Sequence, residues 1–178
     1  MVILGLDCQL RGLARAVLSA DNNENLDIIA TSFIPFDMEI STGYERVYLQ
    51  AFEQTLLSCI TYFPTIIALE IPTASRSRSS YIINAFYGAC AVGAAQYEAI
   101  NSSSLVMSLV VPTWKSKSGL NLAWKESGNK GVIPKNAIPR LISQIYGAAD
   151  GLSADEYDAI AIAAAAYRLN NERIKEQL

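Results

Sequence analysis

The chain has 178 residues, of which 51% are hydrophobic, and this length and apolar content suit one compact α/β domain. It contains no histidine, which excludes Ser-His-Asp and Cys-His catalysis, histidine general bases and the zinc hydrolase motifs built on histidine. The formal net charge is −3, so a nucleic-acid partner is expected only if the basic residues gather in one region.

Three strands are predicted in the first 36 residues. Residues 2–7 form a short apolar run that ends in an acid, which is typical of a buried strand. Residues 13–18 and 26–36 predict two more strands, and the polar stretch 21–25 between them predicts a turn. Together these patterns predict an antiparallel meander.

Helices and strands alternate in the middle of the chain. A helical pattern ends at about Tyr62, and residues 65–70 predict another buried strand that again ends in an acid. Residues 81–100 predict a helix that is apolar nearly all round, so it is either sandwiched inside the domain or shared with a partner subunit. Residues 105–111 predict one further strand.

A polar region follows that strand. Residues 113–133 contain glycine and are rich in lysine, which predicts an exposed segment. Pro134 suits the first turn of a helix, because its missing N–H is not needed there, and this helix is predicted to end at about Tyr146.

The last predicted element is a helix over residues 154–170. Ser153 precedes it as an N-cap, and Glu156 stands where a capping box requires a glutamate. The polar residues 171–178 are expected to fray. The sequence therefore predicts one domain over residues 1–170 and a short polar tail.

The cysteines show no pattern typical of a disulfide framework or a zinc site. There are three of them, Cys8, Cys59 and Cys90, which is an odd number, and no two have C-x-x-C spacing. This argues against disulfides and against a zinc site, and we expect the thiols to be reduced and buried. No stretch approaches the roughly 20 apolar residues of a membrane span, so no membrane partner is expected.

Two acids end apolar strands. Asp7 ends the first strand and Glu70 ends the strand 65–70. A charge at such a place is costly to bury without a partner, and the carboxyl ends of parallel strands are where open α/β sheets place their sites. If the two strands are adjacent, the two acids are neighbours. The ordinary alternative is that each acid only marks the solvent end of its strand.

Two more acids stand at the start of the final helix. Asp155 and Asp158 are three residues apart and therefore share a helix face. Helix capping and the helix dipole explain an acid at Asp155 or Glu156. They explain Asp158 poorly, because it opens the small, apolar run 159–166, which is suited to packing tightly on a sheet.

These four acids predict a metal site if they converge. Four like charges repel one another, and some would stay protonated unless cations neutralised them. Mg²⁺ prefers oxygen ligands, and two such ions can activate a water and stabilise the leaving oxygen in phosphodiester hydrolysis. We expect two Mg²⁺ ions, with Mn²⁺ able to substitute, and no small-molecule cofactor.

The basic residues are unevenly distributed. Residues 76–140 contain eight basic side chains and two acids, a balance of +6, whereas the rest has six and 15, a balance of −9. This local positive charge favours a polyanion partner, although a solvated basic loop is an equally ordinary explanation. The eight residues are Arg76, Arg78, Lys115, Lys117, Lys125, Lys130, Lys135 and Arg140.

In order and spacing, the acid motifs resemble those of the RuvC-type Holliday junction resolvases, which have a ribonuclease-H-like fold. The likeness rests on Ile3-Leu4-Gly5-Leu6-Asp7, on Ile67-Ala68-Leu69-Glu70, and on the D-x-x-D-A-hydrophobic-A-hydrophobic-A pattern over 155–163. It spans nearly the whole chain. The resemblance implies an α/β fold with a five-stranded mixed sheet, three antiparallel strands then two parallel, flanked by helices.

The resemblance also implies roles for individual residues. Asp7, Glu70, Asp155 and Asp158 would be catalytic metal ligands. Lys115 and Lys135 resemble the family's catalytic or DNA-contacting lysines, and Lys117 competes for either role. Each lysine could equally be an ordinary surface residue.

The sequence departs from the family at two places. The family continues the first acid with Pro-Gly, whereas Asp7 is followed by Cys8-Gln9. Cellular members often carry an aromatic residue three positions after the glutamate, where this chain has Thr73. These gaps indicate a divergent member, of phage or organellar type, and leave its cleavage-site preference open. The substitutes for a stacking residue are Tyr81, Trp114 and Trp124, with core packing as the alternative for each.

The function implied is resolution of four-way DNA junctions by paired nicks, carried out in the cytoplasm by a homodimer. Helix 81–100 is a candidate interface element, with ordinary burial as the alternative. Loop 73–80 and segment 113–135 would contact phosphates. The candidate DNA-binding residues are Arg76, Arg78, Lys115, Lys117, Lys125, Lys130 and Lys135.

Two other functions stay open. The same site could act on another nucleic acid, such as a flap, an RNA–DNA hybrid or a structured RNA. The chain could also be a non-catalytic binding module or an actin-like nucleotide-binding relative, but the latter needs glycine-rich phosphate loops, and none follows Asp7.

Overall fold

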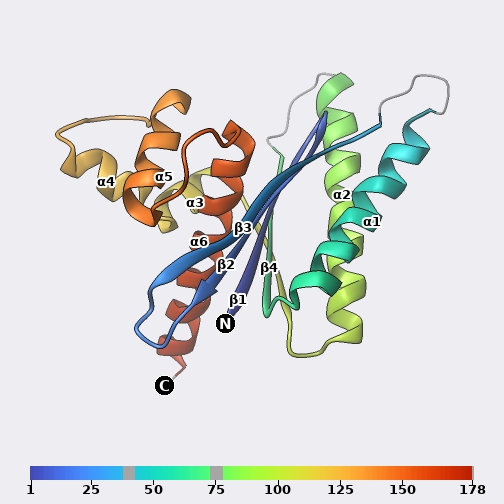
Figure 1. The fold of residues 1–178 in the computed structure, drawn as a ribbon, viewed down its shortest axis with the longest axis horizontal. Helices are drawn as coiled ribbons and strands as arrows, with labels where there is room; N and C mark the ends of the chain where they lie inside the picture. The colour runs from blue at the N-terminus through green and yellow to red at the C-terminus, as the bar shows by residue number, and fades with distance from the viewer. Residues whose placement is uncertain (38–42, 73–77, 178) are drawn as a thin grey trace.

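The computed structural model describes residues 1–37, 43–72 and 78–177, and within them it contains a five-stranded sheet in the order β3-β2-β1-β4-β5 (Figure 1). The pairs β1–β2 and β2–β3 are antiparallel, and the pairs β1–β4 and β4–β5 are parallel. This confirms the predicted mixed sheet. The strands are β1 (Val2–Gln9), β2 (Gly12–Ala20), β3 (Leu26–Pro35), β4 (Ile66–Glu70) and β5 (Leu105–Leu109).

Helices cover both faces of the sheet. Helices α1 (Gly43–Tyr62) and α2 (Arg78–Ile100) pack on one face, and α6 (Ala154–Glu176) packs on the other. The remaining helical segments lie on the α6 side. They are α3 (Val111–Lys117), α4 (Leu120–Glu126), the 3₁₀ turn η2 (Lys135–Ala137) and α5 (Ile138–Tyr146).

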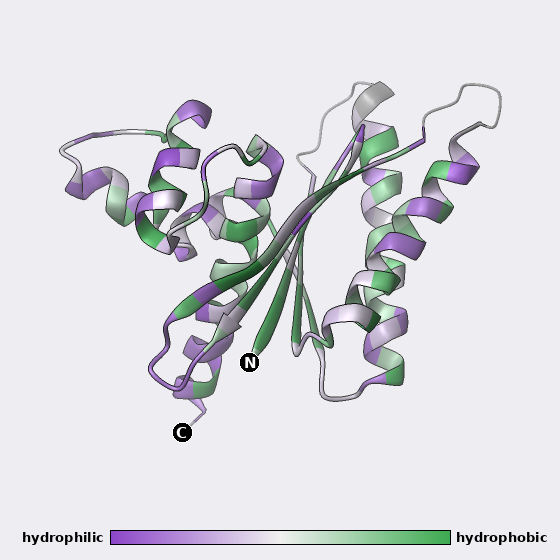
Figure 2. Ribbon diagram, in the orientation of Figure 1, coloured by the Kyte–Doolittle hydropathy of each residue, from purple (hydrophilic) through white to green (hydrophobic). Residues whose placement is uncertain are grey.

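The central strands are apolar because both of their faces are buried, and Figure 2 shows them as a hydrophobic layer between the helices. Side chains alternate between two cores along β1. Ile3 packs with α6, whereas Leu4, Leu6 and Cys8 pack with α1 and α2. The two-sided burial explains why this strand is a continuous apolar run.

Helix α6 lies unusually close to the sheet because both contact surfaces are small. Its residues 159–166 are fully buried. A Cβ added to Gly5 of β1 would meet the backbone of α6, with Ala163 N only 2.8 Å away. Glycine on the strand and alanine on the helix therefore permit the approach that brings the start of α6 beside the end of β1.

Segment 113–133 is more ordered and more buried than its polar composition predicts. It contributes to α3 and supplies α4, and Gly119 separates these two helices with a left-handed φ of 86°. Trp114 is 1% exposed and Leu120 is fully buried, so the prediction of an exposed segment was wrong for these residues. Isolated apolar residues anchor the segment, while most of its polar residues face solvent.

Two other predicted elements end at different residues in the structure than the sequence predicted. The last strand ends at Leu109, because α3 already begins at Val111. Helix α6 continues through the residues expected to fray, and Lys175 near its end forms a 3.0 Å ion pair with Glu24. The capping box of Ser153 and the buried, free state of all three cysteines were predicted correctly. No helix in the described ranges is both long and apolar enough to cross a membrane.

Candidate active site

The strand acids, Asp7 and Glu70, lie side by side on the face of the sheet that α6 covers. In the parallel pairing of β1 with β4, Leu6 is opposite Leu69, so the next residues along the two strands are these acids. Asp7 shares its face with Ile3, and Glu70 shares its face with Ile66, and both of these residues pack against α6. Register and alternation alone thus bring the two carboxylates together.

Asp7 is buried with only one of its carboxylate oxygens satisfied. The side chain is 1% exposed, and its Oδ1 accepts a 2.7 Å hydrogen bond from Gln9 Nε2. Its Oδ2 is buried and has no partner among the residues that the structure describes. Burial, and next the charge of Glu70, raise the pKa of Asp7 well above its ordinary value. A buried oxygen without a donor is costly unless a proton or a cation reaches it.

Glu70 is held in the same one-sided way. Its Oε2 accepts a 2.9 Å hydrogen bond from Nε1 of Trp114, an indole that is itself fully buried. Burial and the nearby charge of Asp158 raise the pKa of Glu70 to about 7, although the Trp114 bond and two lysines oppose the shift. The second carboxylate oxygen is left for other contacts.

The helix acids, Asp155 and Asp158, occupy the first turns of α6. Glu156, which stands between them, is engaged in the cap, because its carboxylate accepts hydrogen bonds from Ser153 N and Oγ at 2.9 and 2.8 Å. Capping therefore does not account for the helix acids. Burial raises the pKa of Asp158 to about 6, and it also raises that of Asp155.

The four acids form one electrostatic cluster. The charges of Glu70, Asp158 and Asp155 all raise the pKa of Asp7. The cations of Lys115 and Lys135 act in the opposite direction on Glu70 and Asp158. The structure therefore brings together all six residues that the sequence predicted as catalytic.

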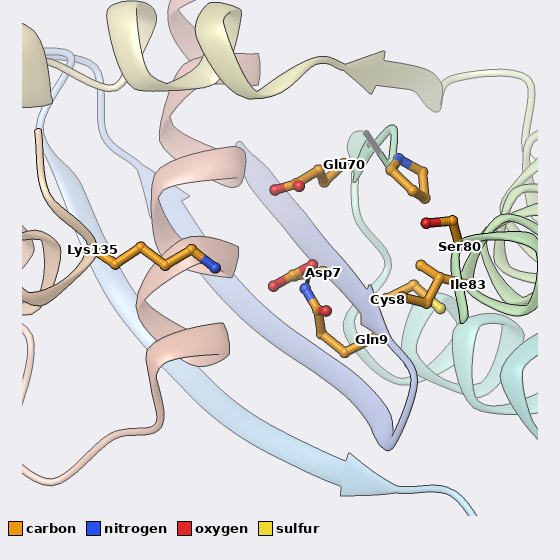
Figure 3. Close-up of a pocket in the computed structure, with 8 residues that line it drawn as sticks. Asp7, Cys8, Gln9, Glu70, Ser80, Ile83 and Lys135 are labelled. Carbon is orange, nitrogen blue, oxygen red and sulfur yellow. Dashed lines mark hydrogen bonds between the residues drawn. The ribbon is translucent and has the colours of Figure 1, made fainter. Parts of the chain in front are cut away.

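A pocket of about 220 Å³ opens at the strand acids. The carboxylates of Asp7 and Glu70 point to the side from which the ammonium group of Lys135 enters (Figure 3). The opposite wall comes from the start of α2. The lining residues are Asp7, Cys8, Gln9, Glu70, Pro72, Ser80, Ile83 and Lys135.

The donor set fits divalent metal ions. Four carboxylates lie close enough for their charges to act on Asp7, which has a buried oxygen that lacks a donor, and oxygen ligands are those that Mg²⁺ prefers. In the described part of the chain, no three acidic or cysteine side chains already surround a single point. A cation here would complete its shell with water or phosphate oxygens, as Mg²⁺ commonly does.

The other predicted basic residues lie away from this pocket or outside the described ranges. Lys117 forms a 2.6 Å ion pair with Glu172 on the surface and does not line this pocket. Lys125 and Lys130 are exposed. Arg76, together with Thr73, falls outside the described residues, and so does the side chain of Arg78.

The structure also separates the three candidate stacking residues. Trp114 is in the core and is bonded to Glu70, so it cannot offer a free ring face to a base. Tyr81 is 68% exposed and is next to Ser80, which lines the pocket. Trp124 is half-buried in α4.

The sequence analysis named Gln9 and Trp114 but missed their roles as hydrogen-bond donors to the strand acids. Gln9 carried a usable signal, because it stands two positions after Asp7 and therefore on the same strand face. Trp114 carried none. It is 44 residues away from Glu70 along the chain, and nothing local indicates that its indole N–H reaches that carboxylate.

Searches of known proteins found likeness in structure only. No protein-family model and no curated protein matches the sequence. A Thermus thermophilus RuvC in complex with a Holliday junction substrate matches with a TM-score of 0.73 at 16% identity, over 97% of this chain and 96% of that one. Another Thermus thermophilus RuvC structure matches equally well, at 17% identity and with 97% of each chain covered.

A more distant match is the yeast mitochondrial Holliday junction resolvase Ydc2. Its TM-score is 0.58 at 13% identity, and the alignment covers 98% of this chain and 83% of that one. These likenesses agree with the strand order and the flanking helices described above. The chain therefore has the RuvC-type, ribonuclease-H-like fold, as the sequence motifs predicted.

Proposed function

We propose that the chain is a divalent-metal-dependent endonuclease that resolves four-way DNA junctions. The observation that carries the proposal is that the strand acids line one pocket and lie within electrostatic reach of the helix acids, with Asp7 Oδ2 buried and unpartnered among the described residues. The fold supports the choice of substrate, because a RuvC of the same fold has been solved with a Holliday junction.

The four acids would hold the ions, and bound divalent cations supply an activated water and charge stabilisation for phosphodiester hydrolysis. The protein's own contribution is orientation and charge. Gln9 and Trp114 fix one oxygen of each strand acid and leave the other oxygen free. Lys135, which lines the pocket, and Lys115 would offset the negative charge of the scissile phosphate.

Contacts to the DNA backbone would come from basic residues outside the pocket. Lys125 and Lys130 are exposed, and the chain carries Arg76 and Arg78 just before the exposed Tyr81. Such contacts position a duplex without reading its sequence. We propose that Tyr81 supplies the aromatic face at the crossover, since Trp114 is buried and a base stacks on any exposed ring.

Symmetric nicking requires two copies of the site, so the proposal includes a homodimer. Helix α2 is buried on one side only. Its other side exposes apolar residues, with Val92 60% and Ile100 74% exposed, which suits a helix shared between subunits. Val92→Glu should convert the dimer to a monomer in light scattering coupled to size exclusion. A wild-type chain that is monomeric at micromolar concentration would contradict this part of the proposal.

Cleavage of synthetic substrates tests the activity directly. The expected result is paired nicking of a four-way junction with Mg²⁺ or Mn²⁺, none with EDTA, and little cutting of linear duplex with the same arms. Equal cutting of junction and duplex would reject junction selectivity. A panel with a flap, an RNA–DNA hybrid and a hairpin RNA would identify the substrate in that case. If none of them is cut, the remaining interpretation is a non-catalytic binding module.

Lys135→Ala should lower the cleavage rate about 100–1000-fold with little effect on stability, because removing a charge-stabilising donor costs about 3–4 kcal/mol in the transition state. Lys175→Ala is the matched control. That lysine is exposed at the far end of α6 and pairs with Glu24, so its loss should leave cleavage unchanged. Equal rates for both variants would exclude Lys135 from the site.

A further inference from the structure

A second pocket lies directly behind one wall of the active-site pocket. It has a volume of about 350 Å³ and is lined by Trp124, Pro134, Asn136, Ala137 and Arg140; we call it the indole pocket. The turn η2 and the proline before it separate the two cavities. Lys135 faces the active-site pocket, while its two chain neighbours line the indole pocket. One short turn therefore forms a wall of both.

The lining of the indole pocket combines a ring, small apolar groups and polar ends. Trp124, Pro134 and Ala137 offer apolar surface of the kind on which a nucleobase packs. The Asn136 side chain carries both a donor and an acceptor for the polar edge of a base. Arg140 is exposed and forms no ion pair among the described residues, so its planar guanidinium is free for a phosphate.

The indole ring itself lacks a hydrogen-bond partner. Trp124 Nε1 is buried and donates to no acceptor in the described part of the chain. An unused buried N–H is unfavourable, and an acceptor atom of a ligand that reached it would gain a bond that the free protein lacks. Trp114 is the opposite case, because its N–H is used by Glu70.

We propose that the indole pocket holds one unpaired nucleotide of the cleaved strand, next to the scissile phosphate, with the base against Trp124 and a phosphate on Arg140. This rests on the proposed function. Figure 3 shows the start of α2 and Lys135 on opposite sides of the active-site pocket. A strand that left on the Lys135 side would pass the turn η2, whose Asn136 and Ala137 line the indole pocket. The base is unpaired because a base inside a duplex cannot lay its face on a protein ring, whereas bases at a branch point can unstack.

The test is a scan of four-way junctions that each carry one abasic site, at successive positions on both sides of the cut. Binding is measured by fluorescence anisotropy in EDTA, so that no strand is cut. One position should weaken binding about fivefold to hundredfold, which is the range for loss of one base–aromatic stack. Trp124→Leu should weaken binding of the intact junction by the same factor and no longer respond to that abasic position.

Arg140→Gln gives a second test that does not disturb the fold, because this side chain is exposed. It should weaken binding and reduce the slope of log affinity against log salt by about one phosphate contact. Arg173→Gln, an exposed arginine near the end of α6, is the matched control and should leave the slope unchanged.

The outcomes separate this inference from the proposed function. If the wild-type chain cuts junctions but the abasic scan is flat, or if folded Trp124→Leu binds as tightly as wild type, the indole pocket holds no nucleotide. If the chain neither binds nor cuts a junction under any metal condition, the proposed function fails and this inference fails with it.

Discussion

The strand acids and the helix acids meet at one site but are held in different ways. Asp7 and Glu70 are fixed by the sheet, and each has one oxygen bonded to an N–H donor, Gln9 or Trp114. Asp155 and Asp158 are held by the start of α6, and the hydrogen bonds of the cap there go to Glu156 instead. The strand acids are thus rigid and half-satisfied, whereas the helix acids depend on where α6 lies.

This difference implies a division of labour. A carboxylate with one oxygen bonded and the other free has a fixed direction, which suits a ligand that defines where an ion sits. A carboxylate on the first turns of a helix can shift with that helix and with bound DNA. The strand acids would therefore set the metal position, and the helix acids would complete the site.

The largest expected effect comes from exchanging one acid of each pair. Asp7→Asn should reduce junction cleavage about a thousandfold or more while sparing junction binding, because it removes a rigid ligand. Asp155→Asn should cost less, since this residue is the less buried of the two. Asp27→Asn, on the exposed side of β3, is the matched control and should cut normally. Equal losses for Asp7→Asn and Asp155→Asn would remove the distinction between the pairs.

The pH dependence of folding stability distinguishes a strand acid from a helix acid in the absence of DNA. The pKa of Glu70 is raised from 4.5 to about 7 and that of Asp158 from 3.8 to about 6. Both carboxyls therefore hold protons more tightly in the folded than in the unfolded chain. The metal-free fold should be most stable below about pH 3.8 with respect to these groups, and it should lose stability as pH rises from there to about 7.

One pKa unit is worth about 1.4 kcal/mol, so the loss should be about 3 kcal/mol for each of the two groups, or roughly 5–10 °C in Tm for each. Calorimetric scans in EDTA across this range measure it. Glu70→Gln should remove its share of the fall between about pH 4.5 and 7, and Asp158→Asn its share between about pH 3.8 and 6. A Tm that rises across the window would show that these carboxyls are not destabilised by burial.

The bond from Trp114 to Glu70 can be removed without removing a ring. Trp114→Phe should weaken metal-dependent cleavage about 10–100-fold, the usual cost of losing a hydrogen bond behind a metal ligand. It should also raise the metal concentration needed for half-maximal rate. Tyr146→Phe is the control, because it deletes a hydrogen bond to Ser118 O and leaves all four acids untouched. If both variants lose stability but keep the same metal dependence, Trp114 is only a core residue.

The smallest expected effect concerns the distance between the pairs. Gly5→Ala would place a Cβ 2.8 Å from Ala163 N, so α6 must move away from β1. The expected cost is about 1–3 kcal/mol of stability, with a fall in cleavage as the helix acids withdraw. Gly88→Ala is the matched control, since nothing lies within 4 Å of its added Cβ, and it should be neutral or slightly stabilising. Unchanged stability for Gly5→Ala would mean that the contact is looser than described.

Much of this could be predicted from the sequence because the determining patterns are local. Apolar runs that end in Asp7 and Glu70 predicted the strands, and the D-x-x-D-A pattern predicted a helix with acids on its sheet-facing side. The alternation along β1 even implies that Gln9 shares a face with Asp7.

What could not be predicted depends on contacts between distant segments. Trp114 sits in a polar stretch, and only the packed α3 shows that it is buried and bonded to Glu70. The helical end of α6 and the ion pair of Lys117 with Glu172 likewise depend on partners far away in the sequence. From composition alone, such residues would be predicted to be exposed and unpaired.

The most direct measurement is a calorimetric titration of Mn²⁺ into the metal-free chain at about pH 8, compared with Asp7→Asn and with Asp27→Asn. The account predicts saturable binding to the wild type and to Asp27→Asn, and its loss in Asp7→Asn, with a matching rise in Tm only where the ion binds. Binding that is the same in all three proteins, or absent from the wild type, would contradict a metal site at these carboxylates.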